Sequence, residues 1–232
     1  MMMHFTLGAF DLSDLVAIGL ILAVWWLTGY LVEHPPKSRA SVSILMAEYR
    51  REWMRQFVTR QPRIFDASMI DSLRQGTAFF ASASMIAIGG GVALIGNSAK
   101  LQGLAQDLTL ETETVGIELK IILVIGFLAN ALLKFIWAHR LFGYCSIIMA
   151  AVPNDPEHEL SFHRAEQAAE INITAAKSFN RGLRSIYFAL SALAWLMGPY
   201  ALMGATALTS LVLMRREFAS QSRLVILAKA AK

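Results

Sequence analysis

Few polar residues that could take part in chemistry lie within the hydrophobic parts of this chain, and two of them share one helix face. Asn130 and Lys134 are one turn apart in an apolar stretch, so both side chains project from the same side. An ionisable residue inside a membrane is costly and is a candidate lining for an ion or solute path. We favour the simpler interpretation that the long Lys134 side chain reaches the nearby water interface.

Three arginines form a second candidate group. Arg140 follows the third hydrophobic stretch, and Arg181 and Arg184 precede the fourth. Their guanidinium groups could hold a lipid phosphate or a partner's carboxylate by forked hydrogen bonds. Ordinary anchoring of helix ends by basic residues is the simpler explanation.

Clusters typical of enzymes and metal sites are not recognisable in the sequence. The chain has one cysteine, Cys145, and its five histidines lie outside the hydrophobic stretches or at their edges, which argues against zinc, iron–sulfur and haem sites. Gly89, Gly90 and Gly91 lack the lysine and hydroxyl of a phosphate-binding loop. We therefore predict no metal, no cofactor and no enzyme activity.

The composition is typical of a membrane protein. Of the 232 residues, 56% are hydrophobic and 16% are charged, and the mean hydropathy is +0.49, well above that of soluble domains. The net charge is +4, and the basic residues flank the hydrophobic stretches. This distribution argues against nucleic acid as a partner and favours membrane lipids.

Four hydrophobic stretches position these residues. The first three, residues 15–32, 77–97 and 116–138, are long enough to span a bilayer. The fourth, residues 186–214, would measure about 43 Å as one helix, against a hydrocarbon core of about 30 Å. Gly198-Pro199 at its middle is typical of one helix ending and another beginning. We predict an all-α polytopic helix bundle, one membrane domain over residues 1–232, with the fourth stretch a helical hairpin; a single tilted span or a re-entrant element is the alternative.

Basic residues set the predicted orientation. Residues 33–76 hold eight Lys and Arg residues, whereas residues 1–14 hold none. The positive-inside rule therefore places residues 33–76 and 139–184 in the cytoplasm and the N-terminus in the periplasm of a bacterial inner membrane. The basic tail after Met214 joins the cytoplasmic side if the fourth stretch is a hairpin.

Two helices carry faces suited to contacts. Ser82, Gly89 and Ala93 are small, lie seven and four residues apart, and so form a face of the second stretch that predicts self-association. Residues 41–60 form an amphipathic helix with an apolar stripe and with Arg50, among other arginines, off that stripe. This helix suits an anionic lipid surface or packing on a partner or on the protein's own cytoplasmic segment.

Three motifs resemble those of a known family. They are KFIWAHRLFGYCSIIMAAVP at 134–153, SFNRGLRSIYFALSALAWLMGP at 178–199 and RREFAS at 215–220. They resemble the bacterial and plant membrane proteins catalogued as domain of unknown function 599. The resemblance implies a multi-span membrane protein without an established activity, and it assigns no catalytic or binding residues.

The sequence thus favours a non-catalytic scaffold or accessory subunit that self-associates or joins a larger membrane complex. The alternative is a channel or small-solute transporter in which Asn130 and Lys134 line the path. An enzyme comes third.

Overall fold

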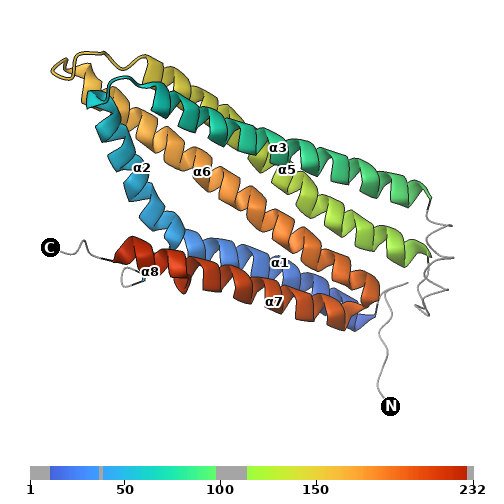
Figure 1. The fold of residues 1–232 in the computed structure, drawn as a ribbon. Coiled ribbons are helices and arrows are strands. Elements are labelled where there is room, and N and C mark those ends of the chain that lie inside the picture. The colour runs from blue at the N-terminus through green and yellow to red at the C-terminus, as the bar shows by residue number, and fades with distance from the viewer. Residues whose placement is uncertain (1–10, 37–38, 98–113, 229–232) are drawn as a thin grey trace. The chain divides into compact units, whose positions relative to one another are not determined.

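The computed structural model describes residues 11–36, 39–97 and 114–228, and this part of the chain is all-α. Its elements are α1 (Leu12–Glu33), α2 (Val42–Thr59), α3 (Ile64–Gly96), α5 (Thr114–Ala150), α6 (Leu160–Leu193), the 3₁₀ helix η1 (Ala194–Met197), α7 (Pro199–Phe218) and α8 (Gln221–Leu227) (Figure 1). Within those three ranges no strand occurs, which confirms the predicted fold class.

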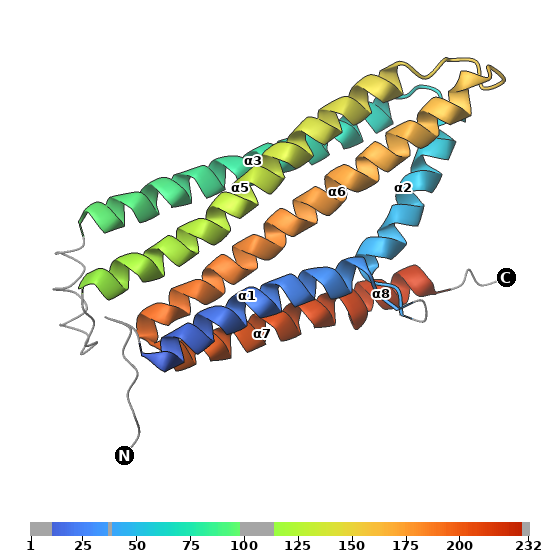
Figure 2. The same ribbon diagram turned by 180° about the vertical axis from the view of Figure 1, so that it is seen from behind.

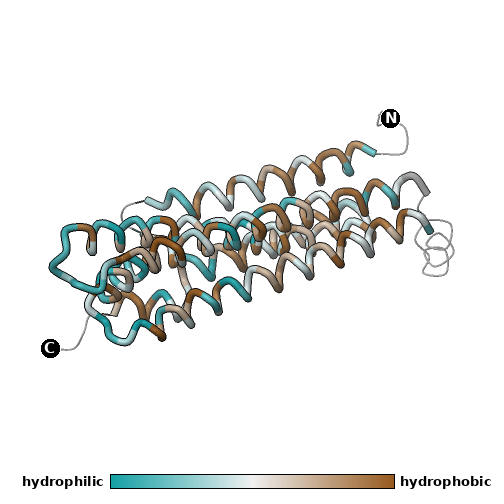
Figure 3. The backbone as a smooth tube through the Cα atoms, turned by 90° about the horizontal axis from the view of Figure 1, so that it is seen from above, coloured by the Kyte–Doolittle hydropathy of each residue, from teal (hydrophilic) through white to brown (hydrophobic). Residues whose placement is uncertain are grey.

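Three helices are long and apolar enough to cross a membrane. They are α1, α3 and residues Gly116–Ala150 of α5. Figure 3 shows α1, the helix that begins nearest the N label, mostly in brown and white. Helices α3 and α5, with 33 and 37 residues, measure about 50 and 55 Å, which exceeds a hydrocarbon core of about 30 Å. Each therefore extends beyond the bilayer, and the protein is a membrane protein.

The chain divides into two compact units, and each unit is built from three separate stretches of sequence. Unit 1 comprises Met1–Leu31, Ala83–Ala131 and Leu183–Arg215, and unit 2 comprises Val32–Ser82, Leu132–Gly182 and Arg216–Lys232. Most of the predicted spanning residues fall in unit 1. The basic segments between and after them fall in unit 2.

Aromatic packing forms the core of unit 1. The rings of Phe127 on α5 and Phe188 on α6 stack with centroids 6.2 Å apart, and the edge of Trp25 on α1 meets Phe127 at 5.7 Å. The buried Trp195 donates its indole N–H to Asp14 Oδ1 at 2.7 Å. In a bilayer, van der Waals contacts and interhelical hydrogen bonds of this kind hold helices together, because lipid provides no hydrophobic drive.

The chain reverses direction at Gly198. This residue has φ 109° and ψ 169°, a region that only glycine occupies readily, and Pro199 begins α7. On either side of the turn, the hydroxyls of Ser191 on α6 and Thr209 on α7 are 2.6 Å apart. The end of α6 and α7 therefore pack against each other as a helical hairpin. Helix α7 also lies beside α1 in both views (Figures 1 and 2).

Helix α2 contributes to the core of unit 2. Its residues Met54, Phe57 and Val58 are buried in a cluster with Ile70 of α3, Cys145 and Met149 of α5, and alanines of α6. Met46 and Tyr49, nearer the start of the same helix, remain exposed. The second half of the amphipathic stripe thus packs on the protein's own segments.

The RREFAS motif fastens the tail to the first turn of α2. The Glu217 carboxylate accepts hydrogen bonds from the backbone N–H of Ser43 at 3.1 Å and from its hydroxyl at 3.0 Å. A carboxylate at this place caps free N–H groups and opposes the positive end of the helix dipole. Arg223 donates to the Ala40 carbonyl at 3.1 Å.

The backbone at Gly198 generates a stability prediction. Replacing Gly198 by Ala should lower the free energy of unfolding by about 1–3 kcal/mol, because a Cβ is strained at this φ and ψ. Gly204→Ala is the matched control, since Gly204 lies within α7, where an added Cβ meets nothing within 4 Å. Thermal unfolding in detergent should show a loss for the first variant only. Equal melting temperatures would contradict the strained turn.

Candidate functional site

Asn130 forms a hydrogen bond within unit 1. Its side-chain amide donates to the Ser185 hydroxyl on α6 at 2.6 Å, and Ser185 is fully buried. A hydrogen bond of this kind between two helices in a membrane contributes about 1 kcal/mol to their association. The amide therefore serves the packing of α5 on α6.

Lys134, in unit 2, has a different environment. The residue is half-buried, and its backbone carbonyl accepts from the Ser178 hydroxyl at 3.0 Å. Its ammonium makes no ion pair with any residue that the structure describes. A charge in this state gains little from its site, so its removal should cost little stability.

The three candidate arginines have three different neighbours. Arg140 is exposed and donates to the Tyr144 hydroxyl one turn further along α5, at 2.6 Å. Arg181 donates from Nε to Glu33 Oε1 at 2.8 Å. Arg184 is 9% exposed, and its Nε lies 3.4 Å from the position that a Cβ on Gly29 would occupy.

Glu33 is the partner that sequence reasoning missed. Its carboxylate also pairs with the Lys177 ammonium at 3.4 Å, so it lies between two cations of α6 in unit 2. The hydrogen bond that Arg181 donates to Glu33 raises the pKa of Arg181 above its usual range, against the smaller opposing effect of burial. The sequence held one signal: Lys177 and Arg181 are four residues apart and share a helix face that needs an acidic partner.

Arg50 of α2 lies in a different environment from the one that the sequence predicted. The sequence analysis placed Arg50 off the apolar stripe, yet its guanidinium donates to the Asn172 amide oxygen of α6. Burial, the larger of two causes, lowers the pKa of Arg50, and the nearby Cys145 acts in the opposite direction. The helical spacing gave a signal, because Arg50, Met54 and Phe57 are four and three residues apart and so lie on one face.

The predicted packing face of α3 is exposed. Ser82, Gly89 and Ala93 all lie on the surface, and a Cβ added to Gly89 would meet nothing within 4 Å. Gly91 packs inside the chain instead, where a Cβ would lie 2.9 Å from Ile125 Cγ1. Over the described ranges no three His, Cys, Asp or Glu side chains lie together as metal ligands would.

Comparison with known proteins identifies the family of the chain. The family model described as "Protein of unknown function, DUF599" matches residues 16–222. No curated protein and no solved structure matches the chain. The match takes in most of the sequence, so the chain belongs to this family, and the resemblance of the three motifs is confirmed.

The unpaired ammonium of Lys134 generates a prediction. Lys134→Met should leave the melting temperature unchanged or raise it, because the variant removes a half-buried charge that forms no ion pair with the described residues. Lys177→Met is the matched control and should lower the free energy of unfolding by up to about 1 kcal/mol, because this ammonium is paired but 45% exposed. Thermal unfolding in detergent measures both. A larger loss for Lys134→Met would show that its charge is needed.

Proposed function

We propose that this member of the DUF599 family is a non-catalytic scaffold or accessory subunit of the bacterial inner membrane, which assembles with copies of itself or within a larger complex. The observation that carries the proposal is the division of α3 into an internal face and a small-residue external face.

The internal face of α3 is used within the chain. Thr77, Ser84 and Gly91 are seven residues apart; the first two are buried, and Gly91 lies against Ile125. Gly89 and Ala93 are each two residues from Gly91, about 200° around a helix of 3.6 residues per turn. The small face is thus nearly opposite the internal one.

The external face suits another helix. Small residues let two backbones approach closely, which favours association of helices in a bilayer. Large apolar side chains border this surface, with Phe79 68% and Ile86 76% exposed. A second copy that placed its own Gly89 and Ala93 here would gain close backbone contacts.

The polar groups of unit 1 support a scaffold over a channel. Asn130 is bonded to Ser185, Ser191 to Thr209, and the hydroxyls of Thr28 and Ser210 are 3.4 Å apart. These side chains satisfy one another between helices. A solute path would need such groups free to replace a hydration shell.

The proposed orientation has the N-terminus in the periplasm and residues 33–76, residues 139–184 and the tail in the cytoplasm. It is supported by the composition of unit 2, which gathers most of these three basic segments. The tail bonds to the first turn of α2 through Glu217 and to Ala40, just before that helix, through Arg223. Polar segments that form hydrogen bonds with each other must share one side of the membrane.

The self-association proposal predicts the effect of bulk at Gly89. Gly89→Leu should convert the oligomer to monomer in mild detergent, because the side chain separates the two backbones. The measurement is the protein mass by size-exclusion chromatography with light scattering. Gly19→Leu is the matched control, since Gly19 is likewise exposed on an apolar helix with nothing within 4 Å of an added Cβ.

The two variants together decide the interface. A loss of mass for Gly89→Leu alone supports the α3 face. A monomeric wild-type protein, or an unchanged oligomer in Gly89→Leu, would contradict the proposal.

A further inference from the structure

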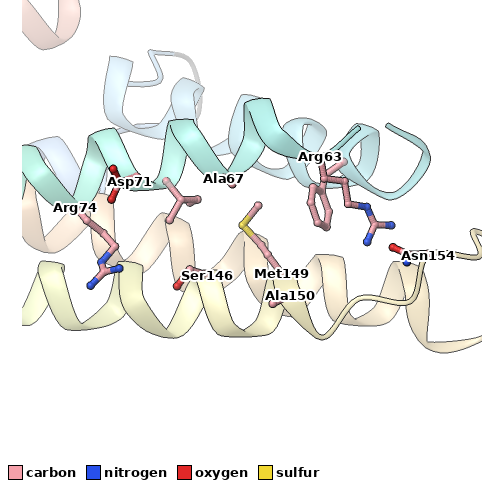
Figure 4. Close-up of a pocket in the computed structure, with 10 residues that line it drawn as sticks. Arg63, Ala67, Asp71, Arg74, Ser146, Met149, Ala150 and Asn154 are labelled. Carbon is pink, nitrogen blue, oxygen red and sulfur yellow. The ribbon is translucent and has the colours of Figure 1, made fainter. Parts of the chain in front are cut away.

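Unit 2 contains a cavity of about 340 Å³ between α3 and α5 (Figure 4). Phe57, Ile70 and Met149 are among its apolar lining residues. Two arginines line the cavity: Arg63, in the turn just before α3, and Arg74 of α3, eleven residues further along the chain. The cavity therefore combines an apolar wall with cationic groups.

The terminal nitrogens of Arg63 already form hydrogen bonds within the protein. They donate to the carbonyls of Val58 at 3.1 Å, Val152 at 3.0 Å and Pro153 at 2.9 Å. The guanidinium also lies over the Phe57 ring, 4.5 Å from the centroid. These contacts hold the segments that follow α2 and α5, so Arg63 serves the fold.

Both arginines have a buried Nε without a hydrogen-bond partner, but only Arg63 donates from its terminal nitrogens to acceptors in the described part of the chain. The Nε atom of Arg74 is buried without a hydrogen-bond partner, and among the described residues its guanidinium takes part in no ion pair. Leaving a buried charged donor unsatisfied costs more than an ordinary lost hydrogen bond. An acid group of a ligand would supply the missing acceptor.

The neighbouring acid does not neutralise Arg74. Asp71 also lines the cavity, but its carboxylate accepts from the Gln75 amide at 2.6 Å. Figure 4 shows the Arg74 side chain extending from α3 toward α5, whereas the Asp71 carboxylate points the other way. The charge of Arg74 is thus free to attract an anion.

The position of Arg74 along α3 favours an amphiphile. Arg74 is the last charged residue before the predicted span 77–97. Basic residues at such a boundary meet the acid groups of membrane amphiphiles. Ile70 and Met149 continue the apolar wall from Arg74 along the cavity.

We propose that this cavity binds an amphiphilic anion, with its carboxylate or phosphate on the Arg74 guanidinium and its apolar chain against Ile70, Met149 and Phe57. A membrane lipid and a free fatty acid share this chemistry. The acid group and the chain are both required, because the cavity offers one unpaired cation and an apolar wall.

The test measures binding of radiolabelled dodecanoate to the purified full-length protein by equilibrium dialysis. The detergent concentration is kept low enough that detergent micelles do not compete with the protein for dodecanoate. We expect saturable binding at one site, weakened at least about tenfold by Arg74→Gln through loss of a charge-assisted hydrogen bond. Arg140→Gln is the matched control, since Arg140 is an exposed arginine of α5 outside the cavity, and it should bind like the wild type.

Competition experiments test separately whether the acid group and the apolar chain are needed, and whether the ligand is a membrane lipid or a free fatty acid. Dodecanol and inorganic phosphate should each fail to displace dodecanoate, because one lacks the acid and the other the chain. Phosphatidylglycerol that displaces it would identify a lipid source, whereas displacement by fatty acids alone would identify the free acid.

If Arg74→Gln does not fold, Ala67→Trp offers a second variant, because Ala67 is exposed and lines the cavity, and it should block binding. Unsaturable binding, binding unchanged by both variants, or displacement by phosphate alone would overturn the proposal.

Discussion

Inside a bilayer, a polar group must find its partner within the protein, and this constraint accounts for most of what unit 1 contains. The backbone meets it by forming helices. Several polar side chains of unit 1 meet it in pairs, among them Asn130 with Ser185, Ser191 with Thr209, and the Trp195 indole with Asp14. Each pair joins two different helices, so the satisfaction of polar groups also fixes which helices are neighbours.

Outside the apolar stretches, charges have water available, and unit 2 uses them to join distant parts of the sequence. Glu33 meets Arg181 across 148 residues, and Glu217 meets Ser43 across 174. The family motif RREFAS gains a physical reason from these contacts, because its glutamate caps α2. Within unit 2, the tail therefore returns to the start of α2.

Much of the fold was predictable because apolar length and helix-breaking residues are local properties. The spanning helices follow from runs of uncharged residues, and the break at Gly198 follows from a glycine and a proline that no continuous helix accommodates. The neighbours of Arg140, Arg181 and Arg184 were not predictable, because helical periodicity says which residues share a face but not which helix covers it. Arg50 illustrates the same limit: its polarity placed it off the apolar stripe, whereas the structure pairs it, half-buried, with Asn172. The buried Nε of Arg74, which has no partner among the described residues, depends on the packing of α3 against α5, and no sequence pattern carries that information.

The most direct test of this account is whether the α6–α7 hairpin crosses the membrane. In a Cys145→Ala background, single cysteines at Tyr200, which is 78% exposed at the start of α7, and at Ser222 on α8 can be labelled with a membrane-impermeant maleimide. The account predicts that Tyr200→Cys reacts in cells whose outer membrane is permeable, and that Ser222→Cys reacts only after the inner membrane is broken. Reaction of both positions on the same side would contradict it.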